Sequence, residues 1–400
     1  MIRWLSILFI ALQLLQPAPP TLASPAAPAV DFVNSEPDAN FGVDVSFHVN
    51  ITSSQALEKV FLYIKPQGQD AAFYPMTFTP QGEAVYRLEL ARQPLRAFSK
   101  IDYYYRVSLA SGEDVVSKTF NFEYKDKRFD WKELENQNFK VYWYNREIDF
   151  GQTALNIAQT GLESAAKLVP ASLTAPIRIY IYASTTDLQS TRLGAQPWVA
   201  GHASPDLHLV MVSISSGPSQ RLELERQLPH EITHILQYDA YGEQAKDLPI
   251  WLLEGTASVA ELYPNADYAS VLQSAVQQNQ LMSIESLCAE FPRDASSAFL
   301  AYAQSQSFVR FLYRKYGATH LQSLYEQYHN GLGCKQGVES VYGVALPELE
   351  YRWRLEELGV NPAALIAQNL LPYWILLFIV LGAASLTILL STRRKYSAHA

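Results

Sequence analysis

Two histidines one helical turn apart constrain this chain of 400 residues more than any other feature. They stand in the run His230-Glu-Ile-Thr-His234, and residues four apart on a helix lie on one face, so both imidazoles can reach one metal ion. Glu254 lies 20 residues beyond His234, after a loop that lets a second helix turn back, and offers a third ligand. Two imidazoles and one carboxylate form a ligand set of catalytic zinc sites, in which a water completes the coordination. The sequence therefore predicts one zinc ion per chain.

Two histidines at this spacing do not by themselves require a catalytic metal. A solvated or structural helix can carry two histidines by chance, and a purely structural zinc site usually has more cysteine ligands than this chain offers. The two cysteines, Cys288 and Cys334, do not form a CxxC pair. They can form one disulfide or none, and an exported domain favours the oxidised pair.

The two ends of the chain carry apolar segments of different length. Residues 1–23 combine a short basic start, an apolar run and a zone of small residues, which predicts a cleaved secretory signal. Residues 370–390 form a longer run without charge, with aromatic residues at its start and the basic residues 393–395 after it. This pattern predicts a single transmembrane helix, a cytoplasmic tail at 391–400 and an ectodomain outside the cytoplasm. A buried C-terminal helix is the alternative.

The overall charge excludes one class of partner. The formal net charge is -8, whereas nucleic-acid binding requires clustered Lys and Arg. We therefore expect no nucleic-acid partner. A hydrophobic content of 48% with 18% charged residues is typical of globular domains and argues against a disordered chain.

Residues 30–125 alternate apolar and polar side chains in short runs, for example at 43–49, 60–64 and 101–107, with turn residues between them. Such runs predict an all-β sandwich that resembles an immunoglobulin-like or fibronectin-type module, although the sequence has no Cys-Trp-Cys signature. The sandwich can bind a ligand, or it can space and orient the next domain.

Residues 131–360 mix strand and helix patterns and are predicted to form an α+β domain. Apolar and alternating runs predict strands at 139–144, 177–182 and 208–213. Apolar residues three or four apart predict helices, among them 155–169 and 299–316, and Gly317 stands at a C-cap position of the latter.

The two candidate metal-binding segments together resemble a known family. His230-Glu-x-x-His234 followed by Leu-Pro-x-Trp-Leu-x-Glu254-Gly is similar to the gluzincin zinc metallopeptidases, most closely to peptidase MA-like domains, over roughly residues 139–328. The resemblance implies a zincin-like fold in which His230, His234 and Glu254 hold zinc. It also implies that Glu231 is the general base for the zinc-activated water. By analogy, Tyr302 donates a hydrogen bond to the oxyanion, or else it belongs to a core stripe of its helix.

The chain departs from this family pattern at two places. Many relatives carry an acidic residue four positions after the ligand glutamate, where it orients a zinc histidine, but Ser258 stands there. Glu261, one turn further on, is the candidate substitute. Pro229, directly before His230, favours a zinc helix that starts or bends at the proline, because proline lacks a backbone donor.

The resemblance also has implications for the residues before the zinc helix. The strand at 208–213 is expected to lie at a sheet edge and to pair with an extended peptide. His202 and His208 are expected to be ordinary surface or loop histidines rather than ligands.

These observations predict a membrane-anchored zinc metallopeptidase that cleaves peptides or proteins outside the cytoplasm. A motif that binds a free amino terminus is not evident, which favours an endopeptidase. Ser258 supports an alternative, in which the domain is catalytically weak or inactive and the protein acts as an extracytoplasmic binding or scaffolding module. A third hypothesis is an adhesion module with an accidental HExxH motif.

Overall fold

The computed structural model describes residues 29–191, 201–360, 370, 372–383 and 385. The chain divides into two compact units, Met1–Lys125 and Asp126–Ala400. The predicted signal segment 1–23 and cytoplasmic tail 391–400 lie outside the described residues.

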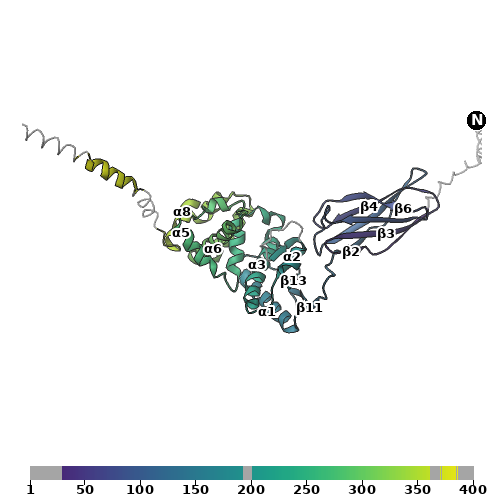
Figure 1. The fold of residues 1–400 in the computed structure, drawn as a ribbon, viewed down its shortest axis with the longest axis horizontal. Coiled ribbons are helices and arrows are strands. Elements are labelled where there is room, and N and C mark those ends of the chain that lie inside the picture. Colours follow the sequence, from purple (N-terminus) through teal and green to yellow (C-terminus); the bar gives the residue numbers. More distant parts are fainter. Residues whose placement is uncertain (1–28, 192–200, 361–369, 371, 384, 386–400) are drawn as a thin grey trace, which may run out of the picture. The chain divides into compact units, whose positions relative to one another are not determined.

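The first unit contains two antiparallel five-stranded sheets (Figure 1). One sheet has the order β1-β3-β7-β6 with β2 paired to β3, and the other has the order β10-β8-β4-β5 with β9 paired to β8. Phe47 of the first sheet and Tyr103 of the second are both buried, and their ring centroids lie 5.2 Å apart, so the sheets share one core. The strands are β1 (Val30–Asn34), β2 (Asp38–Asn40), β3 (Asp44–Ser53), β4 (Leu57–Pro66), β5 (Ala72–Pro75), β6 (Thr77–Phe78), β7 (Glu83–Glu89), β8 (Lys100–Leu109), β9 (Asp114–Val116) and β10 (Phe120–Glu123).

The second unit begins with a mixed sheet of the order β11-β12-β13-β15-β14. Its inner strands, β12 (Phe139–Trp143), β13 (Ile177–Tyr182) and β15 (Leu209–Ser213), are parallel to one another. The outer strands, β11 (Lys132–Glu135) and β14 (Gly201–Ser204), pair antiparallel. The expected edge position of the strand at 208–213 is therefore wrong, because β14 pairs along β15 and takes the edge.

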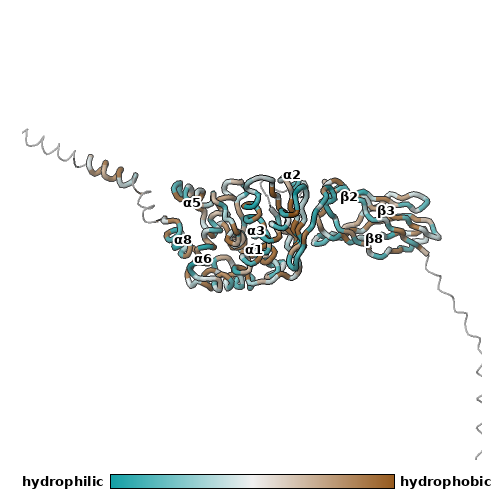
Figure 2. The backbone as a smooth tube through the Cα atoms, turned by 90° about the horizontal axis from the view of Figure 1, so that it is seen from below, coloured by the Kyte–Doolittle hydropathy of each residue, from teal (hydrophilic) through white to brown (hydrophobic). Residues whose placement is uncertain are grey.

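Helices α1 (Ile148–Ala165) and α3 (Gln220–Tyr241) pack on one face of this sheet. Val141, Ile179 and Val212 of the inner strands point into a core that they share with Ile157 and Ile232 of the two helices. Figure 2 shows apolar segments around α1 and α3, the two helices that share this core with the sheet. The sheet therefore fixes the position of α3, the helix that carries the two histidines.

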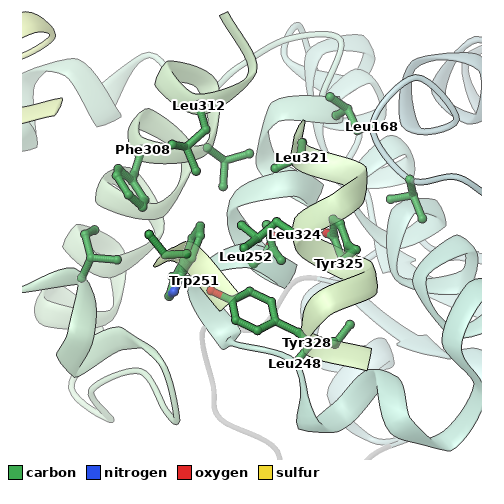
Figure 3. Close-up of a cluster of buried hydrophobic side chains, with 14 of the residues drawn as sticks. Leu168, Leu248, Trp251, Leu252, Phe308, Leu312, Leu321, Leu324, Tyr325 and Tyr328 are labelled. Carbon is green, nitrogen blue, oxygen red and sulfur yellow. Dashed lines mark hydrogen bonds between the residues drawn. The ribbon is translucent and has the colours of Figure 1, made fainter. Parts of the chain in front are cut away.

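The rest of the second unit is mostly helical. α4 (Ile250–Ala260) packs on α6 (Ala295–His329) in a core that includes Trp251, Phe308 and Tyr325 (Figure 3). The predicted helix end at Gly317 is confirmed, because this residue has non-helical angles, φ 85° and ψ 172°, inside α6. The remaining elements are α2 (Thr185–Gln189), α5 (Asp267–Gln277), α7 (Cys334–Tyr342), α8 (Leu346–Glu356) and the 3-10 helices η1 (Pro205–Leu207), η2 (Gly242–Asp247) and η3 (Ile284–Leu287).

The membrane-spanning helix in the predicted fold class is wrong. Residues 372–383 are helical and exposed. Among residues whose positions are described, no helix combines the length and the apolar character that crossing a bilayer requires. This finding contradicts the predicted single-pass localisation.

A disulfide joins Cys288 to Cys334, the first residue of α7. The bridge lies beside the start of α4. The Cys288 carbonyl accepts a hydrogen bond from Ile250 N at 3.0 Å, and Trp251 Nε1 donates to Cys334 Sγ at 3.4 Å. The disulfide therefore supports the first turn of the helix that carries Glu254.

Replacing both cysteines by serine is expected to destabilise the second unit. The bridge closes a loop with a sequence separation of 46, for which chain entropy gives roughly 4 kcal/mol as an upper value. We expect Cys288→Ser/Cys334→Ser to lower the thermal midpoint, followed by circular dichroism, by about 5–15 °C. A midpoint equal to that of the parent protein would contradict this role of the bridge.

Candidate metal centre

Helices α3 and α4 bring the three predicted ligands together. His230 Nε2 lies 3.3 Å, and His234 Nε2 3.6 Å, from Glu254 Oε2. Within the described part of the chain, these side chains form the one group of at least three His, Cys, Asp or Glu residues whose ligand atoms lie within 4.8 Å of one another. Two ligands that are each about 2.0–2.1 Å from a tetrahedral ion lie roughly 3.3–3.4 Å apart. The spacing of the donor atoms therefore fits zinc.

The Glu254 carboxylate has a buried oxygen that lacks a donor. Oε2 is shielded from solvent and, among the described residues, it accepts no well-aligned hydrogen bond. A buried anionic oxygen is costly unless a donor or a cation compensates it. A divalent cation shared with the two imidazoles would supply that compensation, so the chemistry of the donor set also fits a metal.

The charges of the three ligands shift their pKa values. Burial acts to lower the pKa of His230, but the nearby carboxylates of Glu254 and Glu261 outweigh burial and raise it well above its ordinary value. Burial also acts to lower the pKa of His234, but the charge of Glu254 outweighs burial and raises this pKa. For Glu254, burial acts to raise the pKa, yet the two histidines hold it well below its usual range. Glu254 is therefore ionised at neutral pH, as a metal ligand must be.

Glu261 contacts His230, as an acidic residue at the position of Ser258 was expected to do. Glu261 Oε1 lies 3.1 Å from His230 Nδ1, and its side chain is only 3% exposed. Ser258 is fully buried, and its hydroxyl forms no hydrogen bond to either histidine in the described part of the chain. Because an acceptor occupies Nδ1 of His230, the other ring nitrogen is directed toward Glu254.

Pro229 explains how Glu261 reaches His230. The proline lies inside α3, which begins at Gln220, so the zinc helix does not start at the proline. Proline has no N–H, and the carbonyl of Glu225, four residues earlier, therefore lacks its helical donor. That carbonyl accepts a hydrogen bond from Leu262 N at 2.9 Å instead. Since Leu262 follows Glu261, the carbonyl left open by the proline holds the end of α4 beside His230.

Gln237 contacts the second histidine, and the sequence patterns did not indicate this residue. Its Oε1 lies 2.9 Å from His234 Nδ1, and its Nε2 donates to Leu253 O and to the Tyr325 hydroxyl, both at 3.0 Å. Gln237 is 2% exposed and Tyr325 is fully buried. The available signal was an amide three residues after a ligand histidine, a spacing that brings side chains together on a helix.

Glu231 and Tyr302 border the ligands. A Cβ atom on Gly201 of β14 would lie 2.5 Å from Glu231 Oε1, so the glycine makes room for this carboxylate beside the edge strand. The ring centroid of Tyr302, from α6, lies 6.4 Å from that of His230. The negative charge of Glu254, followed by burial and the charge of Glu231, raises the pKa of Tyr302. Its hydroxyl therefore keeps a proton that it can donate.

The other two histidines of interest lie in different surroundings. His208 Nε2 lies 2.8 Å from Asp239 Oδ1, and His202 Nε2 lies 3.3 Å from Ser204 Oγ. Neither belongs to the metal-binding group found among the described residues.

Several known proteins are similar to parts of this chain. A variant of an M1 zinc metallopeptidase from Deinococcus radiodurans is similar over 78% of this chain and 88% of its own, with 11% identity and a TM-score of 0.35. A carbohydrate-binding module family 56 β-1,3-glucan binding domain is similar over 23% of this chain and 98% of its own, with 19% identity and a TM-score of 0.18. No curated protein matches the chain. The model of the Peptidase MA superfamily matches residues 157–357, and the chain belongs to this superfamily.

A methyl group at position 255 is expected to disturb the site by pushing α4 away from α6. A Cβ atom on Gly255 would lie 2.5 Å from the backbone oxygen of Ser305, so α4 and α6 would have to separate. We expect Gly255→Ala to lower the free energy of unfolding by about 1–3 kcal/mol, measured by urea denaturation. Zinc binding should weaken as well, because Glu254 is the preceding residue.

Gly333→Ala is the matched control for this substitution. Its Cβ atom would lie 2.4 Å from Gln336 Oε1, but that atom ends an exposed side chain that can rotate away. We expect little change in stability or zinc affinity. Equal losses in the two alanine variants would contradict the role of close contact between α4 and α6.

Proposed function

We propose that the second unit is a zinc-dependent metallopeptidase that hydrolyses internal bonds of peptide or protein substrates. The observation that carries the proposal is the convergence of His230 Nε2, His234 Nε2 and Glu254 Oε2 in a domain of the Peptidase MA superfamily, with Glu231 on the same helix as the histidines. One such group supports one zinc ion per chain. The sequence has no evident motif for a free amino terminus, which favours endopeptidase action.

In this proposal Glu231 is the general base. Bound zinc supplies a Lewis acid that polarises the scissile carbonyl and makes a water more acidic. The Glu231 carboxylate accepts the proton of the attacking water and passes it to the leaving amine. The room that Gly201 leaves next to Glu231 Oε1 supports this role, because the carboxylate must stand close to the reacting atoms.

Tyr302 stabilises the developing negative charge. Its hydroxyl donates a hydrogen bond to the carbonyl oxygen of the substrate as that oxygen gains charge. The nearby charge of Glu254 raises the pKa of the Tyr302 phenol and keeps the donor protonated. Glu261 and Gln237 keep the two histidines oriented through their Nδ1 atoms.

An inactive, scaffolding domain is a weaker proposal. Ser258 was the residue that favoured it, because a missing carboxylate next to a zinc histidine weakens metal binding. Glu261 provides a carboxylate 3.1 Å from His230 Nδ1, so the argument from Ser258 loses its main support.

Substitution of Glu231 and of Glu254 should separate catalysis from metal binding. We expect Glu231→Gln to retain one zinc ion per chain and to lose roughly 10²–10⁴-fold in peptide hydrolysis, the range of a general base. Glu254→Ala should lose much of the zinc, because it removes a ligand. Elemental analysis gives the zinc content, and a fluorogenic peptide library gives the activity.

Two results would overturn this proposal. A parent protein without zinc after purification and zinc loading would remove the metal site. Cleavage by Glu231→Gln at the parent rate would show that another group is the base.

Tyr302→Phe tests the oxyanion donor. Loss of one such donor typically lowers kcat by about 10²–10³-fold, and we expect this loss with little change in KM or zinc content. Tyr313→Phe is the control, because Tyr313 lies on the same helix but packs against the core around Trp251. If Tyr302→Phe hydrolysed peptides as fast as the parent protein, Tyr302 would be a core residue and not the oxyanion donor.

A further inference from the structure

The tautomer of His234 depends on a hydrogen bond remote from the metal. A neutral imidazole carries its proton on one nitrogen, and only the other nitrogen can bind a metal. Nε2 of His234 faces Glu254 Oε2 at 3.6 Å, while Nδ1 lies 2.9 Å from the side-chain amide of Gln237. An amide can either accept from Nδ1 with its oxygen or donate to Nδ1 with its nitrogen. Its orientation therefore decides whether Nδ1 meets an acceptor or a donor, and an acceptor at Nδ1 leaves Nε2 free to bind the metal.

The carbonyl of Leu253 determines the orientation of this amide. A carbonyl oxygen only accepts hydrogen bonds, so the group 3.0 Å from Leu253 O must be the NH2 of Gln237. The Tyr325 hydroxyl lies within 3.4 Å of Leu252 O, to which it donates, and its oxygen accepts from the same NH2 at 3.0 Å. Figure 3 shows Tyr325 packed beside Leu252 of α4. A flipped amide would place two oxygens against each other at Leu253, which burial makes costly.

We propose that Gln237 is a positioning residue that holds His234 as its Nδ1–H tautomer and thereby directs the Nε2 lone pair to the metal. The inference rests on the zinc site of the proposed function. Two hydrogen bonds in series carry this effect. Gln237 Nε2 donates to Leu253 O, and His234 Nδ1–H donates to Gln237 Oε1. Leu253 directly precedes Glu254, so the backbone next to the third ligand sets the tautomer of the second.

The two histidines thus have partners of different chemistry. His230 Nδ1 faces the carboxylate of Glu261, which accepts through either oxygen and needs no fixed orientation. Position 237 requires an acceptor on one side and a donor on the other, which an amide provides and a carboxylate does not. A neutral amide also avoids a further buried negative charge near Glu254 and Glu261.

The first test measures the tautomer in the parent protein. The full chain is labelled with 15N-histidine, freed of metal and kept at a pH high enough for neutral imidazoles. Two-bond and three-bond proton–nitrogen correlations then identify the protonated nitrogen of His234. We expect Nδ1–H. An Nε2–H tautomer in this protein would overturn the inference without any variant.

The second test uses substitutions at position 237. Gln237→Leu should give a mixture of tautomers and lower the zinc affinity by about 10–100-fold, measured by competition with a chelator. Gln237→Glu should restore the Nδ1–H tautomer, because a carboxylate accepts from Nδ1, while stability falls because Leu253 O loses its donor. This rescue of the tautomer is not expected of a residue that only fills space.

Gln306→Leu is the matched control. Gln306 is 2% exposed, and its Nε2 donates to the α4 carbonyl of Ser258 at 3.1 Å, but it contacts neither histidine. We expect a loss of stability with an unchanged tautomer and zinc affinity. An Nδ1–H tautomer that persists in Gln237→Leu would overturn the inference even if zinc binds and Glu231→Gln is inactive. Conversely, if the protein binds no zinc, the proposed function is wrong, but the tautomer of His234 can still be measured in the metal-free protein.

Discussion

The packing of α3 against α4 is the interaction on which the rest of the second unit depends. α3 carries His230 and His234, and α4 carries Glu254. Two hydrogen bonds join the helices beside the ligands, from Leu262 N to the carbonyl of Glu225 and from the Gln237 amide to the carbonyl of Leu253. α6 packs against the other side of α4, where Gly255 lets the two helices lie close together. Contacts between helices, rather than loop conformations, therefore set the ligand geometry.

Local periodicity predicted the parts of the structure that depend on local geometry. His230 and His234 face the same way because four residues span about one helical turn. Glu254 can join the two histidines if a second helix turns back toward the first, and α4 does so. Likewise, the alternating runs at 60–64 and 101–107 lie inside β4 and β8.

Features that depend on tertiary contacts were not predictable from the same patterns. β14 spans four residues without alternating apolar side chains, so the patterns did not indicate a strand that could displace 208–213 from the edge position implied by the resemblance. Pro229 favoured a helix that starts or bends at the proline, because an interior proline usually costs stability. Instead, α3 begins at Gln220, and Leu262 N satisfies the carbonyl that the proline leaves open. Gln237 looked like one polar residue among many, because its role requires Leu253 and Tyr325 from other helices. The apolar run at 370–390 predicted a membrane span, which no helix among the described residues provides.

The bonds that hold the histidines also bear on how this domain acquires its ion. The three donor atoms lie at distances that suit zinc, and a core of Trp251, Phe308 and Tyr325 is buried close by. Domains that fold only around zinc lack such an independent core. For the proposed zinc site we therefore expect metal exchange to leave this core folded. A chain that has lost its ion is then expected to bind zinc again without unfolding.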